Sequence, residues 1–167
     1  AGIDAVLKEA AEQGVDWVLI DTAPQTDSNA VAAIEAADMV LAICRTTIVD
    51  LRAIMNTLRL CRSRDITPHV VLTQFETQGP VRAETNRTLE GMEVPVLHEG
   101  LAHRMAFQYS MIDGQGVTEF DPSGKAAGEA RALYKAICHL ASMQSSRHDG
   151  IATPRLTSGS RRKALTA

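Results

Sequence analysis

The fold can be predicted from one stretch of the chain, Val15-Asp16-Trp17-Val18-Leu19-Ile20-Asp21-Thr22-Ala23-Pro24. Its apolar residues Val18, Leu19 and Ile20 are continuous rather than alternating, which is typical of a strand buried on both faces of a parallel sheet. Asp21 comes where this strand would end, and Pro24 cannot continue the strand because proline lacks a backbone donor. Ligands of open α/β sheets bind beyond the carboxyl ends of the strands. Asp21 is therefore either a ligand-binding carboxylate or the cap of a turn.

The composition predicts one domain followed by a basic tail. Of the 167 residues, 45% are hydrophobic and only 4% aromatic, which suits a core of small aliphatic side chains between helices and a sheet. The formal net charge is -3, but residues 145–167 carry five basic side chains and one acidic one. The rest of the chain is therefore acidic, which leaves only local basic patches for nucleic-acid binding. We predict a domain over residues 1–143 and a disordered tail over 144–167.

Cysteine spacing and hydropathy exclude several other classes. Cys44, Cys61 and Cys138 are widely spaced, so the sequence indicates neither a zinc site nor a disulfide framework. No apolar run approaches the roughly 20 residues of a membrane span. The first residues lack the pattern of a signal peptide and an initiating methionine. We therefore expect a cytoplasmic protein without a membrane partner, and we interpret the chain as beginning inside a longer protein.

Helices and strands are predicted to alternate along the chain. Apolar runs predict strands at residues 18–21, 39–44, 68–75 and 94–97. Apolar residues at helical spacing predict helices that run from residue 3 to Gly14, after Ser28, from Asp50, over 81–89, over 102–111 and from Asp121 to Ser142. This order predicts an α/β domain with a mostly parallel sheet flanked by helices.

Each predicted strand is followed by a polar turn. These turns are Asp21-Thr22, Arg45-Thr46-Thr47, Thr73-Gln74 and His98-Glu99. Because parallel strands end at the same edge of a sheet, the turns predict a polar ligand pocket at that edge.

Several segments follow one another as they do in a known family. Asp16–Pro24 is similar to the YDYVIIDTPP segment of ParA-type partition ATPases, within the ParA/MinD group of deviant-Walker P-loop NTPases. Asn29–Leu41 resembles the helix and strand that come next in that family, and Leu72-Thr73-Gln74 resembles a later strand end. Residues 104–122 and 124–134 are similar to its R.AY…G..V.E.DP segment and the helix that follows. The resemblance covers about residues 3 to 141.

The resemblance implies an ATPase of plasmid or chromosome partitioning. Such proteins use ATP and Mg²⁺, and the homodimer formed with ATP binds DNA without sequence preference. A ParB-like, centromere-binding adaptor protein stimulates their hydrolysis of ATP. By this resemblance the protein would be cytoplasmic and associated with the nucleoid.

The resemblance also implies roles for particular residues near the phosphates. Asp21 would match the catalytic-site acid that holds Mg²⁺, directly or through water. The second switch, whose backbone changes with the γ-phosphate, would be formed by Thr22, Ala23, Pro24 and Gln25.

Other residues would match the base side of the nucleotide and the contact surfaces. Thr73, Gln74 and His98 would lie near the base. The candidates for contact with DNA or across the dimer are Arg104, Arg82 and Arg87.

One part of the family pattern does not occur in this sequence. The P-loop run Lys-Gly-Gly-x-Gly-Lys-Thr is missing, and the Gly124-Lys125 pair opens a helix without following a strand. The phosphate nest and the γ-phosphate lysine are therefore missing as well. Because the P-loop strand belongs to the sheet, we expect neighbouring apolar strands to be left unpaired. We interpret residues 1–143 as a partial, P-loop NTPase-like domain without its N-terminal strands, unable to hydrolyse ATP alone.

Two other functions stay open at this point. A MinD-like positioning ATPase at the membrane would need an amphipathic C-terminal helix, which Gly150, Pro154 and Gly159 oppose. A non-catalytic interaction module would bind a partner without nucleotide.

Overall fold

The structure is a computed structural model that describes residues 2–23 and 28–145. The described residues form two compact units, one up to Asp38 and a larger one over Met39–Met143. Pro24 and Gln25 of the predicted switch lie outside the described residues, as does the predicted tail from residue 146 onward. In the described ranges, no helix has the length and apolar character needed to cross a membrane.

The smaller unit contains two helices, α1 (Ile3–Glu12) and α2 (Ser28–Ala36), which contact each other. Gly14 adopts φ +69, and the Val15 N–H donates to the Ala10 carbonyl at 3.0 Å. A glycine in the left-handed region is a common end for a helix, since it has no Cβ to clash. The predicted end of the first helix at Gly14 is therefore confirmed.

The strand predicted at residues 18–21 is wrong. These residues form no strand, and Leu19 is 84% exposed while Trp17 and Val18 are each 38% exposed. A strand buried on both faces needs hydrogen-bonded neighbours on each side and helices above and below. In the ranges 2–23 and 28–145 no strand pairs with this run. Its backbone therefore has no inter-strand hydrogen bonds to stabilise a buried, extended conformation.

The larger unit contains a parallel sheet. Its strands are β1 (Leu41–Arg45), β2 (His69–Phe75) and β3 (Leu101–Ala102), in the order β1-β2-β3. Both pairs are parallel, which confirms the prediction of an α/β fold with a parallel sheet. Among the described residues β1 pairs with β2 alone, so β1 lies at one edge of this sheet.

The strand predicted at residues 94–97 is reduced to a single bridge. Val96 faces Val70, whose N–H donates to the Pro95 carbonyl and whose carbonyl accepts from the Leu97 N–H, each at 2.8 Å. Pro95 has no N–H to extend the ladder. The chain then leaves the sheet and returns as β3, which was not predicted.

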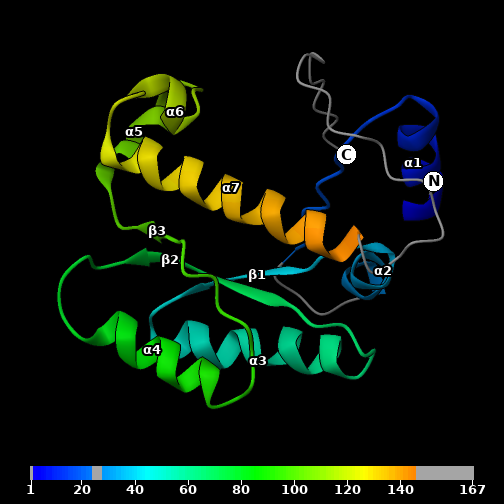
Figure 1. Ribbon diagram of the computed structural model, residues 1–167, viewed down its shortest axis with the longest axis horizontal. Helices are drawn as coiled ribbons and strands as arrows, with labels where there is room; N and C mark the ends of the chain where they lie inside the picture. The colour runs from blue at the N-terminus through cyan, green and yellow to red at the C-terminus, as the bar shows by residue number, and fades with distance from the viewer. Residues whose placement is uncertain (1, 24–27, 146–167) are drawn as a thin grey trace. The chain divides into compact units, whose positions relative to one another are not determined.

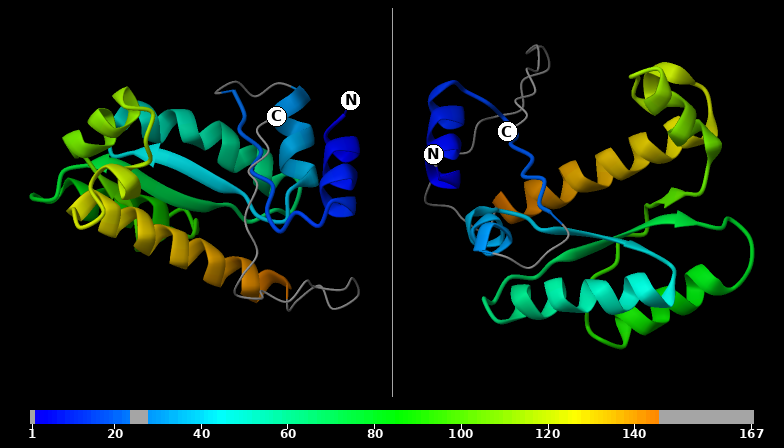
Figure 2. Two further views of the ribbon diagram at one scale, coloured as in Figure 1. Left: turned by 90° about the horizontal axis from the view of Figure 1, so that it is seen from above. Right: turned by 180° about the vertical axis from the view of Figure 1, so that it is seen from behind.

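Helices cover both faces of this sheet. Helices α3 (Ile48–Arg62) and α4 (Val81–Glu90) lie on one face, and α7 (Lys125–Ser145) lies on the other (Figure 1; Figure 2 shows the same from behind). Between β3 and α7 come α5 (Met105–Ile112) and the four-residue α6 (Val117–Phe120). Helix α3 begins before the predicted Asp50, because the Thr47 hydroxyl accepts from the Asp50 N–H and caps it. Helix α7 begins after the predicted Asp121, and α6 was not predicted.

The core of the larger unit is centred on β2. Val70, Val71 and Leu72 are buried to 1% exposure or less, as expected for a central strand covered on both faces. Cys61 of α3 and Leu89 of α4 are equally buried. Burial raises the pKa of the Cys44 thiol on β1 to about 11. Cys44 is therefore a protonated core side chain at neutral pH.

Candidate functional site at the carboxyl edge of the sheet

The three parallel strands end at one edge of the larger unit. In register, Thr73 on β2 lies opposite Arg45 at the end of β1 and opposite Leu101 on β3. Thr73 and Gln74 therefore lie near the carboxyl ends of the strands, inside β2 rather than in the turn after it. This is the edge at which ligands of open α/β sheets bind.

Gln74 has an unusual backbone at this edge. Its φ is +52, and the pairing of β2 with β3 is irregular between Thr73 and Phe75. A side chain other than glycine is disfavoured in the left-handed region, and such residues cluster at functional sites. Gln74 is exposed, so its amide is available to a ligand.

Arg82 connects α4 to this edge. Its guanidinium carbon lies 4.0 Å from the centre of the Phe75 ring, and Nη2 donates to the His98 carbonyl at 2.5 Å. The His98 side chain is 97% exposed, with Nδ1 3.9 Å from a Glu99 oxygen. The Arg82 side chain therefore connects Phe75 at the sheet edge to the loop before β3. His98 takes part in this contact through its backbone carbonyl and not through its ring.

Gly100 lets the loop reach the sheet. A Cβ at this position would lie 2.5 Å from the Leu72 carbonyl oxygen and 2.9 Å from the Phe75 ring. The close approach of backbone to backbone requires a residue without a side chain.

Arg104 is paired with Glu129 of α7. Its Nε and Nη2 donate to Glu129 Oε1 at 2.9 and 2.5 Å, and Glu129 Oε2 accepts from the Ala102 N–H at 3.1 Å. The two side chains are 24% and 23% exposed. The hydrogen bond to Glu129 raises the pKa of Arg104 above its ordinary value. Arg104 is thus part of an anchor that attaches α7 to β3 and the start of α5.

A second anchor stands at the end of β1. Arg45 Nε and Nη2 donate to the two carboxylate oxygens of Asp50, each at 3.1 Å, and the Thr47 hydroxyl also donates to Asp50. The hydrogen bonds from Thr47 and then Arg45 lower the pKa of Asp50. The edge therefore carries two carboxylates that are already hydrogen-bonded.

The remaining predicted residues lie apart from this cluster. Arg87 is exposed on α4, with one long bond, 3.4 Å, to the Ala83 carbonyl of its own helix. Asp21, Thr22 and Ala23 are exposed residues of the smaller unit. The sequence did not single out Glu129 or Asp50 as site residues. For Asp50 a signal existed, since an acid three residues after Thr47 is a helix-start pattern.

The edge fits one part of a nucleotide better than another. Thr73, Gln74 and the backbone of the loop before β3 offer hydrogen-bonding groups of the kind that recognise a base. Within residues 2–23 and 28–145, no three His, Cys, Asp or Glu side chains gather in a way that could hold a metal ion. The described edge thus offers hydrogen-bonding groups, and no such metal cluster lies beside them.

Comparison with known proteins assigns no family. No protein-family model matches the chain, and no curated protein sequence matches it. The resemblance to ParA-type ATPases therefore rests on the sequence motifs, and the function below is a proposal.

Proposed function

We propose that this chain forms the base-side part of a ParA-type partition ATPase, which segregates DNA by ATP-dependent dimerisation and non-specific DNA binding. The observation that carries the proposal is the carboxyl edge of the parallel sheet. Thr73 and Gln74, which the resemblance assigns to the base, lie at this edge beside the loop that contains His98. The ordered motifs from Asp16 to Tyr134 support the same assignment.

The phosphate side of the proposed site requires groups that this sequence does not contain. A phosphoryl-transfer site needs a Gly-rich loop and a lysine to hold the phosphates. The 167 residues contain no Gly-x-x-x-x-Gly-Lys-Ser/Thr run. We therefore derive no hydrolytic step from these residues. Asp21, exposed at the end of its apolar run, is proposed as the acid that would face Mg²⁺ in a site completed by a P-loop.

The chain alone is expected to release no phosphate from ATP above the rate of a buffer blank. The Asp21→Ala variant, which lacks the proposed metal-facing acid, is expected to give the same rate as the unmodified chain. A phosphate-release assay with Mg²⁺ and ATP measures both. Turnover that is above the blank and lost in Asp21→Ala would contradict the expectation.

Replacing Arg87 by alanine is expected to weaken binding to random-sequence duplex DNA. The Arg82 and Arg104 guanidiniums hold loops and helices in place, whereas the Arg87 side chain, among the described residues, bonds only within its own helix. Losing one phosphate contact should lower the slope of log affinity against log salt by about 1. Fluorescence anisotropy over a salt series measures this slope.

The control for that experiment removes the same charge elsewhere. Lys135 is exposed on α7, and Lys135→Ala should leave the slope unchanged if α4 faces the DNA. Equal slopes for Arg87→Ala and the unmodified chain would exclude Arg87 as a contact. Flotation with anionic vesicles in the absence of DNA binding would favour the MinD-like alternative.

A further inference from the structure

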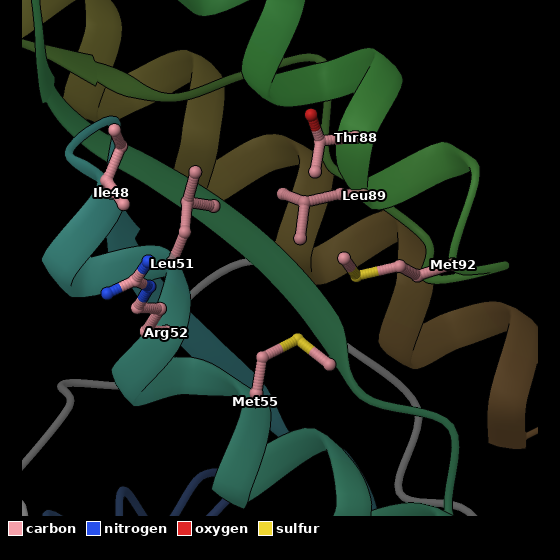
Figure 3. A pocket seen from close by; sticks show the side chains of 7 residues that line it. All are labelled: Ile48, Leu51, Arg52, Met55, Thr88, Leu89 and Met92. Atoms are coloured by element: carbon pink, nitrogen blue, oxygen red, sulfur yellow. The ribbon is translucent and has the colours of Figure 1, made fainter.

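An apolar groove runs between α3 and α4 on the face of the larger unit that these helices cover. Figure 3 shows its lining, with Leu51 and Met55 of α3 facing Leu89 and Met92 across it. Its volume is about 320 Å³, and Ile48 and Arg52 stand along the α3 side. Pockets that bind ligands begin at about 300 Å³, so the groove has room for a few apolar side chains.

The groove exposes apolar side chains at positions where the solvent-facing side of a surface helix ordinarily carries polar ones. Ile48 is 70% exposed and Met92 is 36% exposed. Leu51 and Met55 are partly buried against the core, so the groove floor is continuous with it. Methionine side chains adapt to the shape of a partner, which makes Met55 and Met92 suitable for binding a helix.

The α3 side of the groove is basic. Ile48, Arg52 and Met55 are spaced by four and three residues, and the same stripe continues as Arg59 and Arg62. Arg62 Nη2 donates to the Met92 carbonyl at 2.9 Å, which brings a guanidinium to the end of the groove. The Arg52 side chain makes no hydrogen bond or ion pair with another described residue.

No acid on α3 offsets this charge. Asp50, the acidic residue of α3, is bonded to Arg45 and Thr47. A partner that covers the groove would therefore meet an apolar floor and a row of arginines along one side. Charge complementarity of this kind selects the partner and speeds its association.

We propose that this groove binds an amphipathic helix of a partner protein, with apolar residues at i, i+3, i+4 and i+7 and acidic residues along one flank. The apolar floor favours a helix over DNA, because a duplex presents phosphates and has no apolar face for Met55 and Met92 to contact. This inference goes beyond the proposed function and needs no nucleotide.

The test uses the 167-residue chain and labelled helical peptides of about 18 residues. The peptides share one apolar face, and their flanks carry Glu, Gln or Lys. Fluorescence anisotropy is expected to give the tightest binding for the Glu peptide, about tenfold tighter than for the Lys peptide, with the difference shrinking as salt is added.

Two variants separate the apolar and charged contributions. Met92→Glu places a charge in the groove and should abolish binding of all three peptides. Arg52→Glu should reverse the preference, so that the Lys peptide binds more tightly than the Glu peptide. Lys135→Glu makes the same charge change on α7 and should leave the preference unchanged, and circular dichroism checks that each variant is folded.

Other outcomes would overturn the proposal. Binding of all three peptides with equal affinity, or no binding at all, would show that charge does not select an occupant here. A further outcome is that duplex DNA displaces the Glu peptide from the unmodified chain and binds Met92→Glu with unchanged affinity. That pair of results would assign the arginines to DNA. Sedimentation that shows self-association lost in Met92→Glu, without peptide binding, would make a second copy of the chain the occupant.

Discussion

Replacing Gly100 by alanine should lower the stability of the larger unit by about 3 kcal/mol, because the added methyl group has no room. A Cβ would lie 2.5 Å from the Leu72 carbonyl oxygen, which belongs to the central strand and cannot move without breaking the sheet. For the larger unit, Met39–Met143, the loss corresponds to a fall of roughly 12–24 °C in Tm. Urea unfolding followed by circular dichroism measures it.

The matched control is Gly128→Ala in α7. A Cβ at Gly128 would meet nothing within 4 Å, and the residue is part of the helix. Alanine is favoured over glycine inside a helix by about 0.8–1.0 kcal/mol, so this variant should be more stable than the unmodified chain. If Gly100→Ala were as stable as Gly128→Ala, the close approach of the loop to β2 would be wrong.

Replacing Glu129 by alanine should destabilise the protein by about 2 kcal/mol, because hydrogen bonds to charged groups are worth about 1.5–3 kcal/mol and water reaches part of this site. The substitution removes the acceptor for the Arg104 guanidinium and for the Ala102 N–H. The Ala102 amide should then exchange its hydrogen faster, since β3 is only two residues long. Hydrogen exchange and urea unfolding together test this.

Glu129→Gln separates the charge from the hydrogen bonds. The amide oxygen can still accept from Ala102, so this variant should lose less stability than Glu129→Ala. Lys135→Ala on the same helix should leave the stability nearly unchanged, since that side chain is exposed. Equal stability of Glu129→Ala and Lys135→Ala would mean that the carboxylate does not attach α7 to β3.

The parts of the fold that could be predicted are those with a local signal. The continuous apolar runs before Cys44 and Phe75 predicted β1 and β2, and helical spacing predicted α1, α3 and α4. The parallel sheet followed from their alternation. For β1, β2, α3 and α4 these patterns are sufficient because each element buries side chains against its neighbours, whereas α1 has no buried residue.

The run Trp17–Ile20 shows where local signals fail. Its composition is that of a buried strand, but burial depends on neighbouring strands, and no described strand pairs with it. For strand β3 the prediction from sequence fails in the opposite way, because a strand forms where none is predicted. Leu101 and Ala102 carry no strand signal and are held in the sheet by the approach of Gly100 and by the Glu129 carboxylate.

The candidate site was partly predictable for the same reason. Thr73 and Gln74 follow a clear strand pattern, so their place at the carboxyl edge could be predicted. The pairing of Arg104 with Glu129 could not, because 25 residues separate the two and no spacing rule connects them. The left-handed backbone of Gln74 also carries no sequence signal, since glycine or asparagine is the usual residue there.

We propose that these residues are part of a ParA-type ATPase. This claim can be tested by the intact mass of the protein isolated from the cells that make it, compared with its coding sequence. The claim predicts a product that contains residues 1–167 together with a Gly-Lys-Thr phosphate-binding loop, because ATP cannot be held without one. A native product of 18.0 kDa, made of these 167 residues alone, would contradict it.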